Sequence, residues 1–233
     1  MYDRGVAFYS RVKAAPPANY VHIGCGFTAP AEWMNFDVSP TLRAERLPII
    51  GRLLGRLAGN PQYFPANVRH GDIIRGLPLP DGTVSAIYAS HVLEHLAFDD
   101  LGKALDNCFR MLRPGGVLRL VVPDLEARAR AYLESRANGV DDAGNVFLER
   151  CGLGTKRRPR RIMDRLRATF GNSAHLWMWD EGSMREALLR AGFRRINRVG
   201  PRQWADPMFT LVEDDRRLTA NGAAELTLEA TKV

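Results

Sequence analysis

The stretch NYVHIGCG, residues 19–26, indicates the fold class of this 233-residue chain. Its first residues form a short apolar run of the kind found in buried strands. Gly24 and Gly26 follow at once, and glycine permits a tight turn and a close approach of the backbone to a ligand. Ligands of open α/β sheets bind at the carboxyl ends of parallel strands. The stretch therefore predicts the first strand of such a sheet and a ligand-binding turn directly after it.

Strands and helices alternate along the rest of the chain. We expect strands over 32–39, 67–73, 82–90, 117–123, 193–200 and 224–232, and helices over 91–97, 99–112, 125–137 and 180–191. This alternation is typical of parallel βαβ units whose sheet is covered by helices. The last segment alternates apolar and polar residues, as an antiparallel strand buried on one side would. The prediction is an α/β, doubly wound single domain over residues 1–233.

Composition excludes several classes of protein. No apolar run approaches the about 18 residues of a membrane span, and the first twenty residues lack the apolar core of a signal peptide. We therefore expect a cytoplasmic protein. Cys25, Cys108 and Cys151 are odd in number, widely spaced and without a C-x-x-C pair, so we expect free thiols.

The net charge of +7 favours an anionic partner. Basic residues gather in 46–57 (RLPIIGRLLGRL) and 156–167 (KRRPRRIMDRLR). The second lies in 139–179, which we interpret as a cap or substrate-binding insertion that is irregular over 139–171. Either basic segment suits a solvated cap helix, contact with an anionic acceptor or membrane surface, or nucleic acid. No nucleic-acid module is recognisable, so we do not expect that partner. The oligomeric state is left open.

Two motifs suggest other enzymes. Gly24, Gly26 and Ala29 fit the dinucleotide pattern G-x-G-x-x-A, which calls for an acidic residue about 20 residues further on. Asp37 follows Gly24 by only 13 residues, and Pro30 interrupts the stretch between them. This spacing disfavours a dinucleotide.

The segment SHVLEHL, residues 90–96, contains H-x-x-E-H, the pattern of an inverted zinc peptidase. On the predicted helix, His91, Glu94 and His95 share one face. In an inverted zinc peptidase this motif lies on a long helix. Here it directly follows a predicted strand. That context disfavours a peptidase and leaves a polar cluster at the edge of the sheet.

Several motifs in sequence order resemble class I S-adenosylmethionine-dependent methyltransferases. They are HIGCG, WMNFD, HGDI, LPLPDGTVSAIYASHVLEHL, CFRMLRPGGVLRLVVPDL, HLWMWDEGSMREALLRAGF and ELTLEATK. The likeness covers about residues 19–232 and is greatest to a small bacterial subgroup with an abbreviated first crossover. It implies a Rossmann-like, mostly parallel seven-stranded sheet with an antiparallel last strand.

The resemblance also implies a cofactor, S-adenosyl-L-methionine, and a role for each matching residue. The methionine portion would lie on Gly24, Cys25 and Gly26, the ribose on Asp37, the adenine on Asp72 and the backbone of Ile73, and the reacting methyl near Ser90 and His91. For Asp37 and Asp72, the alternative is a plain turn residue.

The resemblance favours methylation of a hydroxyl oxygen on a sugar, such as a surface glycan or glycolipid, or on another small molecule. We expect catalytic residues among His91, Glu94, His95 and His175, since histidine suits proton transfer near neutral pH. A cofactor-binding protein without turnover and an RNA O-methyltransferase are the alternatives.

A divalent metal is a further hypothesis, with Glu94, His95 and His175 as ligands and His91 as a fourth ligand or base. The pattern resembles the E-x-x-E-H…H metal site of small-RNA 2′-O-methyltransferases and ubiquinone-pathway O-methyltransferases. Here His91 replaces the first acid, and a mixed set suits zinc, manganese or iron better than magnesium. The alternative is that His175 forms a hydrogen bond within the cap.

Overall fold

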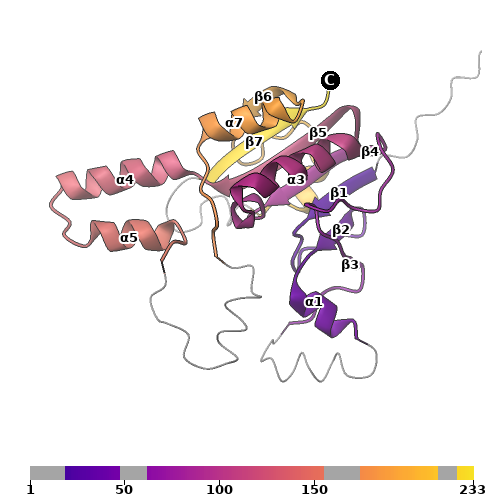
Figure 1. Ribbon diagram of the computed structural model, residues 1–233, viewed down its shortest axis with the longest axis horizontal. Coiled ribbons are helices and arrows are strands. Elements are labelled where there is room, and N and C mark those ends of the chain that lie inside the picture. Colours follow the sequence, from indigo (N-terminus) through magenta and orange to yellow (C-terminus); the bar gives the residue numbers. More distant parts are fainter. Residues whose placement is uncertain (1–18, 48–61, 155–173, 215–224) are drawn as a thin grey trace, which may run out of the picture.

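The computed structural model describes residues 19–47, 62–154, 174–214 and 225–233 (Figure 1). Within these ranges, seven strands form one sheet in the order β3-β2-β1-β4-β5-β7-β6, as the resemblance implies. The strands are β1 (Asn19–Ile23), β2 (Met34–Asp37), β3 (Val68–His70), β4 (Val84–Ser90), β5 (Leu112–Pro123), β6 (Arg194–Arg198) and β7 (Glu225–Thr231).

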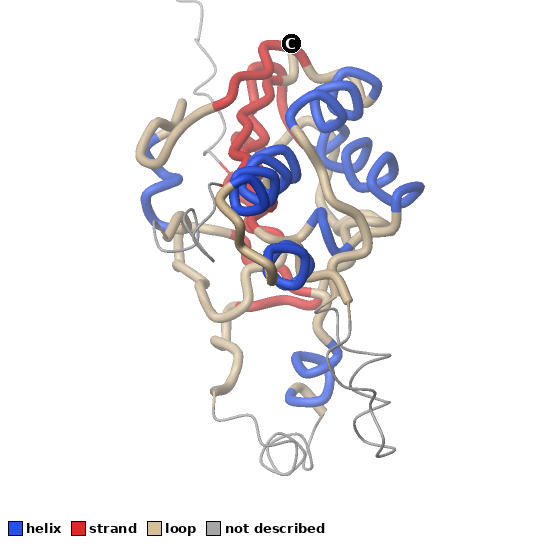
Figure 2. Tube along the Cα trace, turned by 90° about the vertical axis from the view of Figure 1, so that its left-hand side faces the viewer, coloured by secondary structure: helices blue, strands red, loops and turns tan. Residues whose placement is uncertain are grey.

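The helices lie beside this sheet, which Figure 2 shows as a narrow column of strands. They are α1 (Pro40–Glu45), α3 (Phe98–Met111), α4 (Leu125–Ala137), α5 (Ala143–Arg150) and α7 (Glu181–Arg190), with short 3₁₀ helices at Leu93–His95 and Pro207–Leu211. Three of the predicted helices, α3, α4 and α7, are confirmed. None of the helices in the described ranges combines the length and the hydrophobicity needed to cross a lipid bilayer.

The winding of the sheet reverses at β1, which pairs in parallel with β2 on one side and β4 on the other. No helix separates β1 from β2 in the chain, in agreement with the expected short crossover. Ligands of doubly wound sheets bind at such a switch point. The carboxyl ends of β1, β2 and β4 therefore define the edge where a site is expected.

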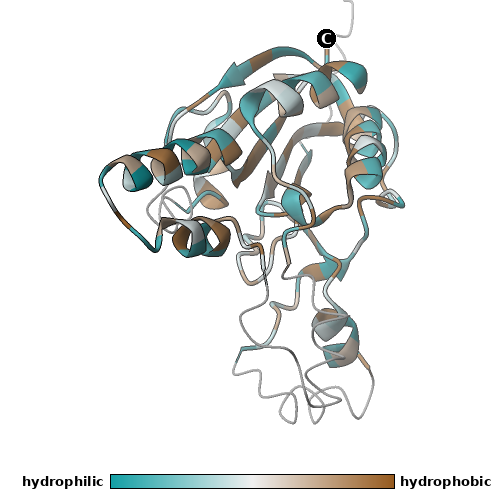
Figure 3. Ribbon diagram, turned by 60° about the vertical axis from the view of Figure 1, so that its left-hand side comes forward, coloured by the Kyte–Doolittle hydropathy of each residue, from teal (hydrophilic) through white to brown (hydrophobic). Residues whose placement is uncertain are grey.

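Both faces of the sheet are covered by apolar side chains, and the central strands are mostly brown in Figure 3. On one face, α3 presents a buried stripe at helical spacing, made of Leu101, Ala104, Leu105, Cys108 and Met111. On the other face, Trp33, Tyr88 and Phe209 form a separate buried cluster. The 3₁₀ helix at 207–211 supplies Phe209, so the chain between β6 and β7 covers that face.

Residues 224–232 contain the predicted antiparallel strand, but the prediction that this strand is buried on one side only is wrong. β7 lies between β5 and β6, antiparallel to both, and its first six residues are all buried. Its polar face is covered by arginines: Glu229 accepts a hydrogen bond from Arg119 at 2.8 Å, and Glu225 accepts one from Arg128 at 3.0 Å. Because these pairs neutralise the buried charges, the alternating pattern does not require solvent.

The predicted irregular segment 139–171 is also partly helical, because α5 occupies Ala143–Arg150. Figure 1 shows α4 and α5 side by side, reaching beyond the sheet, and the two helices are in contact. The basic segment 156–167, and residues 48–57 of the other one, lie outside the described residues. Their predicted roles therefore stay predictions.

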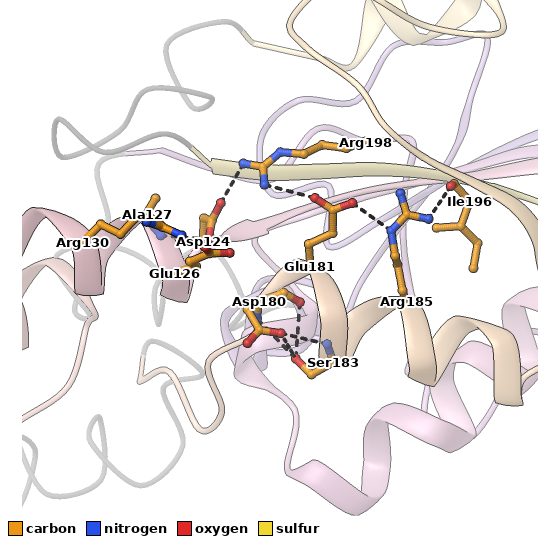
Figure 4. A network of polar contacts seen from close by, with 10 residues as sticks. All are labelled: Asp124, Glu126, Ala127, Arg130, Asp180, Glu181, Ser183, Arg185, Ile196 and Arg198. Carbon is orange, nitrogen blue, oxygen red and sulfur yellow. Dashed lines mark hydrogen bonds and ion pairs between the residues drawn. The ribbon is translucent and has the colours of Figure 1, made fainter.

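A polar network fixes the start of α7 to β6 and α4 (Figure 4). Arg198 of β6 donates to Asp124, the N-cap of α4, at 2.7 Å and to Glu181 of α7 at 3.2 Å. Asp180 caps α7 by accepting a hydrogen bond from the backbone N–H of Ser183 at 2.8 Å. The network thereby fixes where segment 174–179, which runs directly into α7, meets the sheet.

Replacing this cap should destabilise the fold in a pH-dependent way. The hydrogen bond from the backbone N–H of Ser183 lowers the pKa of Asp180 from its ordinary value of 3.8. The carboxylate therefore stabilises the folded state above that value, and this contribution is lost as the pH falls through the lowered pKa. Asp180→Ala should reduce the free energy of unfolding by about 0.5–2 kcal/mol near neutral pH, with a smaller difference in acid, measured by urea unfolding.

Asp142→Ala is the matched control, because Asp142 precedes α5 but makes no side-chain capping hydrogen bond. Its loss of stability near neutral pH should be smaller. Equal losses in the two variants at every pH would contradict the assigned role of Asp180.

Candidate active site

The turn after β1 brings the backbone of Gly24 against the segment that follows β4. Gly24 has a φ of 63°, in the left-handed region that favours glycine. A Cβ atom on Gly24 would lie 2.3 Å from Cγ2 of Val92, so a side chain here would push the two segments apart. Gly26 has a φ of 54°, and a Cβ atom on it would meet nothing within 4 Å among the described residues beyond its chain neighbours. The turn is therefore closed at Gly24 and open above Gly26.

Asp37 ends β2 and holds this turn. Its Oδ2 atom accepts a hydrogen bond from the backbone N–H of Gly26 at 3.0 Å, and its Oδ1 atom accepts one from Ser39 at 2.7 Å. The contact with Ser39 is the one expected if Asp37 were a plain turn residue. The contact with Gly26 in addition connects the end of β2 to the turn after β1. Each carboxylate oxygen keeps lone pairs for further donors. The carboxylate is thus able to accept ribose hydroxyls, which remains a prediction.

Asp72 and Ile73 follow β3 and belong to a turn. The Oδ1 atom of Asp72 accepts a hydrogen bond from the backbone N–H of Ile74 at 2.9 Å, and its Oδ2 atom lies 3.5 Å from Nε of Arg75. Ile73 is buried, and its carbonyl accepts a hydrogen bond from Asn107 at 2.9 Å. These contacts match the alternative of a turn acid. The adenine contact stays a prediction.

β4 ends at Ser90 beside the glycine turn, and His91 follows it. The hydroxyl of Ser90 is buried and has no hydrogen-bond partner among the described residues. The backbone N–H of His91 donates to Val121 of β5 at 2.9 Å, and His91 has a φ of 53°. Residues other than glycine rarely adopt this conformation, and those that do cluster at functional sites. Both residues therefore lie at the edge where a ligand is expected, and their contact with the reacting methyl stays a prediction.

The predicted helix over 91–97 is wrong. The positive φ of His91 and the irregular backbone of Val92 (φ −125°, ψ −48°) leave only a 3₁₀ helix over Leu93–His95. Leu93 and Leu96 are buried in the core. The polar residues of the motif are therefore gathered by a tight turn and not by one face of an α-helix.

This turn and the segment before α7 place Glu94, His95 and His175 together. One ligand atom from each residue lies within 4.8 Å of the other two. Glu94 is fully buried, and its Oε1 atom lies 3.1 Å from Nδ1 of His91 and 4.0 Å from Nε2 of His95. The four residues predicted to be catalytic thus form one cluster, although His175 is 80 residues from His95 in the sequence.

Hydrogen bonds hold the two parts of the cluster to each other. The carbonyl of Glu94 accepts from the backbone N–H groups of Leu176 and Trp177, at 2.8 and 3.2 Å. The imidazole of His175 donates from Nδ1 to the carbonyl of Cys151 at 2.7 Å, so the alternative of a hydrogen bond within the cap is also present. Burial lowers the pKa of His175, which keeps its ring neutral near pH 7.

The three cysteines are free, as predicted, and the structure buries all of them. Burial raises the pKa of Cys25 and of Cys108 to about 12 and also raises the pKa of Cys151. These side chains therefore remain neutral thiols. Since the thiolate is the nucleophilic form of cysteine, none of the three suits covalent catalysis.

One feature of the site was missed in the sequence. Phe98 and Trp177 pack with ring centroids 4.8 Å apart, yet remain 53% and 45% exposed, and Trp179 is buried beneath them. The signal was the run WMW at 177–179, two residues after His175. The backbone N–H of Trp177 donates to the carbonyl of Glu94, which joins the segment that carries these rings to the polar cluster.

Comparisons with known proteins agree with this geometry. Residues 21–120 match a family described as a methyltransferase domain. A probable S-adenosylmethionine-dependent methyltransferase of Mycolicibacterium smegmatis is 40% identical over 63 residues, which cover 27% of this chain and 23% of that protein. An uncharacterised 37.1 kDa protein of a Streptomyces fradiae transposon is 31% identical over 120 residues, covering 51% and 34%. The matches thus span about a third or less of these relatives' own length.

Solved structures of methyltransferases also align with this chain, at low sequence identity. A putative methyltransferase in complex with the Haloferax volcanii Trm112 activator aligns with a TM-score of 0.48 and 14% identity, over 95% of this chain and 85% of the other. A methyltransferase of Thermotoga maritima, described as a possible histamine N-methyltransferase, aligns with a TM-score of 0.46 and 20% identity, over 94% and 84%. Residues 21–120 of this chain thus match a methyltransferase domain, and they lie in a seven-stranded sheet of the kind that the resemblance to class I S-adenosylmethionine-dependent methyltransferases implies.

Proposed function

We propose that the chain transfers a methyl group from S-adenosylmethionine to a hydroxyl oxygen of a sugar or a similar small molecule. One observation carries this proposal: the backbone of Gly24 packs on Val92, the residue that follows His91. A cofactor on the glycine turn and an acceptor beside the polar cluster would therefore be neighbours at one edge of the sheet. The family match supports the same reaction class.

The residues at this edge fit the cofactor. The space above Gly26 is open, so the methionine portion would meet backbone there and not a side chain. Asp37 presents a carboxylate beside that space, with lone pairs for two ribose hydroxyls. The unpartnered hydroxyl of Ser90 lies at the end of the adjacent strand, and a buried polar group of this kind is satisfied by a ligand.

When bound, the cofactor supplies a methyl group on a sulfonium, which passes to the acceptor oxygen as the sulfur–carbon bond breaks and its electron pair stays on sulfur. The acceptor loses its hydroxyl proton in the same reaction. His91 is the residue of the cluster closest in sequence to the end of β4, and we assign it as the base that accepts this proton. Alignment of the two reactants accounts for much of the catalysis in such a displacement.

The exposed aromatic pair supports a sugar as the acceptor class. Phe98 and Trp177 offer apolar ring faces, and the imidazole and carboxylate groups of the neighbouring cluster offer hydrogen bonds. Sites for small molecules combine apolar and aromatic walls with a few polar groups that fix orientation. A pyranose, which has apolar ring faces and hydroxyls at its rim, matches this combination.

Cofactor binding tests the first half of the proposal. Asp37→Ala should weaken the binding of S-adenosylmethionine by about 1.5–3 kcal/mol in calorimetry, because hydrogen bonds to a charged acceptor are lost. Asp81→Ala is the control, since Asp81 is an exposed acid in the turn before β4. Unchanged affinity in Asp37→Ala would contradict the ribose contact.

The acceptor is tested with methyl-labelled cofactor and a panel of methyl glycosides, with total RNA as a comparison. For a glycoside that is methylated, Trp177→Ala should raise KM about tenfold, equivalent to about 1.4 kcal/mol, with little change in kcat. Leu189→Ala, which removes an exposed side chain of α7, should leave KM unchanged.

An unchanged KM in Trp177→Ala would exclude the aromatic pair from the acceptor site. If the protein binds the cofactor but methylates neither glycosides nor RNA, the alternative of a cofactor-binding protein without turnover gains support.

A further inference from the structure

The cluster of Glu94, His95 and His175 has the composition and spacing of a metal site. It offers one carboxylate and two imidazoles from two segments far apart in the sequence, with ligand atoms within 4.8 Å of one another. This spacing is close to the separation of ligands that share one ion, because ligand bonds of about 2.0–2.2 Å place neighbouring donors about 3–4 Å apart. Small side-chain movements would complete the arrangement.

The carboxylate of Glu94 provides a second, independent observation. The residue is fully buried, and its Oε2 atom is buried without a hydrogen-bond partner among the described residues. No lysine or arginine pairs with it in the described part of the chain; its contacts are the two imidazoles of His91 and His95. A buried carboxylate is costly unless it is paired with a cation or bound to a metal. The free oxygen therefore indicates a missing positive partner.

The two histidines are oriented as ligands. The Nδ1 atom of His95 is 2.9 Å from the carbonyl of Ala174, and the Nδ1 atom of His175 is 2.7 Å from the carbonyl of Cys151. Since a carbonyl only accepts, each ring carries its proton on Nδ1, which leaves the lone pair on Nε2. Metal-bound histidines are held in this way, with the second ring nitrogen donating to a backbone carbonyl.

Space for His175 is provided by a glycine. Gly152 has a φ of 63°, and a Cβ atom on it would lie 2.6 Å from Nδ1 of His175. The end of α5 thus leaves room for the imidazole and supplies the carbonyl that fixes its orientation. Ring centroids of His95 and His175 are 5.1 Å apart. The arrangement draws on α5, on the turn after β4 and on the segment before α7.

We propose that Glu94, His95 and His175 bind a divalent transition-metal ion through the carboxylate and the two Nε2 atoms. Imidazole ligands favour zinc, manganese or iron over magnesium, which prefers oxygen ligands. Three protein ligands leave at least one coordination position open. His91 donates from Nδ1 to Oε1 of Glu94 and so orients the carboxylate.

We assign the open coordination position to the acceptor oxygen. This assignment rests on the proposed function, whereas the binding of the metal does not depend on it. A bound cation lowers the pKa of a coordinated hydroxyl. The hydroxyl proton would pass to His91, the oxygen would form a bond to the methyl carbon, and the sulfur would keep the electron pair of the broken bond. No oxidant or reductant is needed.

The experiment measures metal binding directly. Untagged protein is stripped with EDTA, and Zn²⁺, Mn²⁺ and Mg²⁺ are titrated by calorimetry, with the retained ion counted by elemental analysis after gel filtration. We expect one Zn²⁺ or Mn²⁺ per chain and at least tenfold weaker binding of Mg²⁺. His175→Ala and Glu94→Gln should each lower the Zn²⁺ affinity at least tenfold.

His70→Ala is the matched control, because His70 is an exposed histidine on β3 whose Nε2 accepts a hydrogen bond from Arg43. It should bind metal as the wild type does. The proposal would be overturned if the wild type bound no metal, or if His175→Ala bound as much metal as the wild type. If the buried Glu94→Gln variant does not fold, His175→Ala alone decides.

Titration of S-adenosylmethionine into the metal-free protein separates this inference from the proposed function. If the metal-free protein binds the cofactor and transfers methyl groups at the full rate, the role of the metal in catalysis is contradicted and the proposed function stands. If the protein binds metal but transfers no methyl group to any acceptor, the metal site stands and the proposed function is contradicted.

Discussion

The close approach of Gly24 to Val92 is the contact on which the site depends. β1 and β4 pair in parallel and end at the same edge of the sheet. The residues that follow the two strands, Gly24 and Val92, therefore compete for space. Glycine resolves this competition, because a Cβ atom would lie 2.3 Å from Val92. The same contact leaves Val92 and Leu93 to pack inward and directs His91 and Glu94 toward the edge. The cofactor turn and the polar cluster are thus parts of one packing arrangement.

The regular elements were predictable because their signals are local. The apolar stripe of α3, the N-cap residues Asp124 and Asp180 and the glycine after β1 each act within a few residues. The turn at 91–96 was not predictable, since spacing of three and four residues fits an α-helix as well as a tight turn. The deciding feature is the positive φ of His91, which residue type does not indicate.

Long-range partners account for the rest. The polar residues of β7 suggest a solvated face, but Arg119 and Arg128 pair with them across 110 and 97 residues. The closeness of His95 and His175 also depends on contacts between residues far apart in the sequence. It is set by where α7 begins and by the hydrogen bonds of Leu176 and Trp177 to Glu94. Resemblance to a family suggested His175, whereas hydropathy and periodicity alone gave no reason to place it there.

The position of β7 also constrains the order in which the sheet assembles. β5 and β6 both precede β7 in the chain, yet neither pairs with the other, because β7 lies between them. Until β7 is inserted, both strands present unpaired backbone edges, Arg119 lacks Glu229 and Arg128 lacks Glu225. Contacts between residues far apart in sequence form slowly, and open strand edges favour association between chains. Folding of this domain is therefore most vulnerable to aggregation in the interval before its last strand is in place.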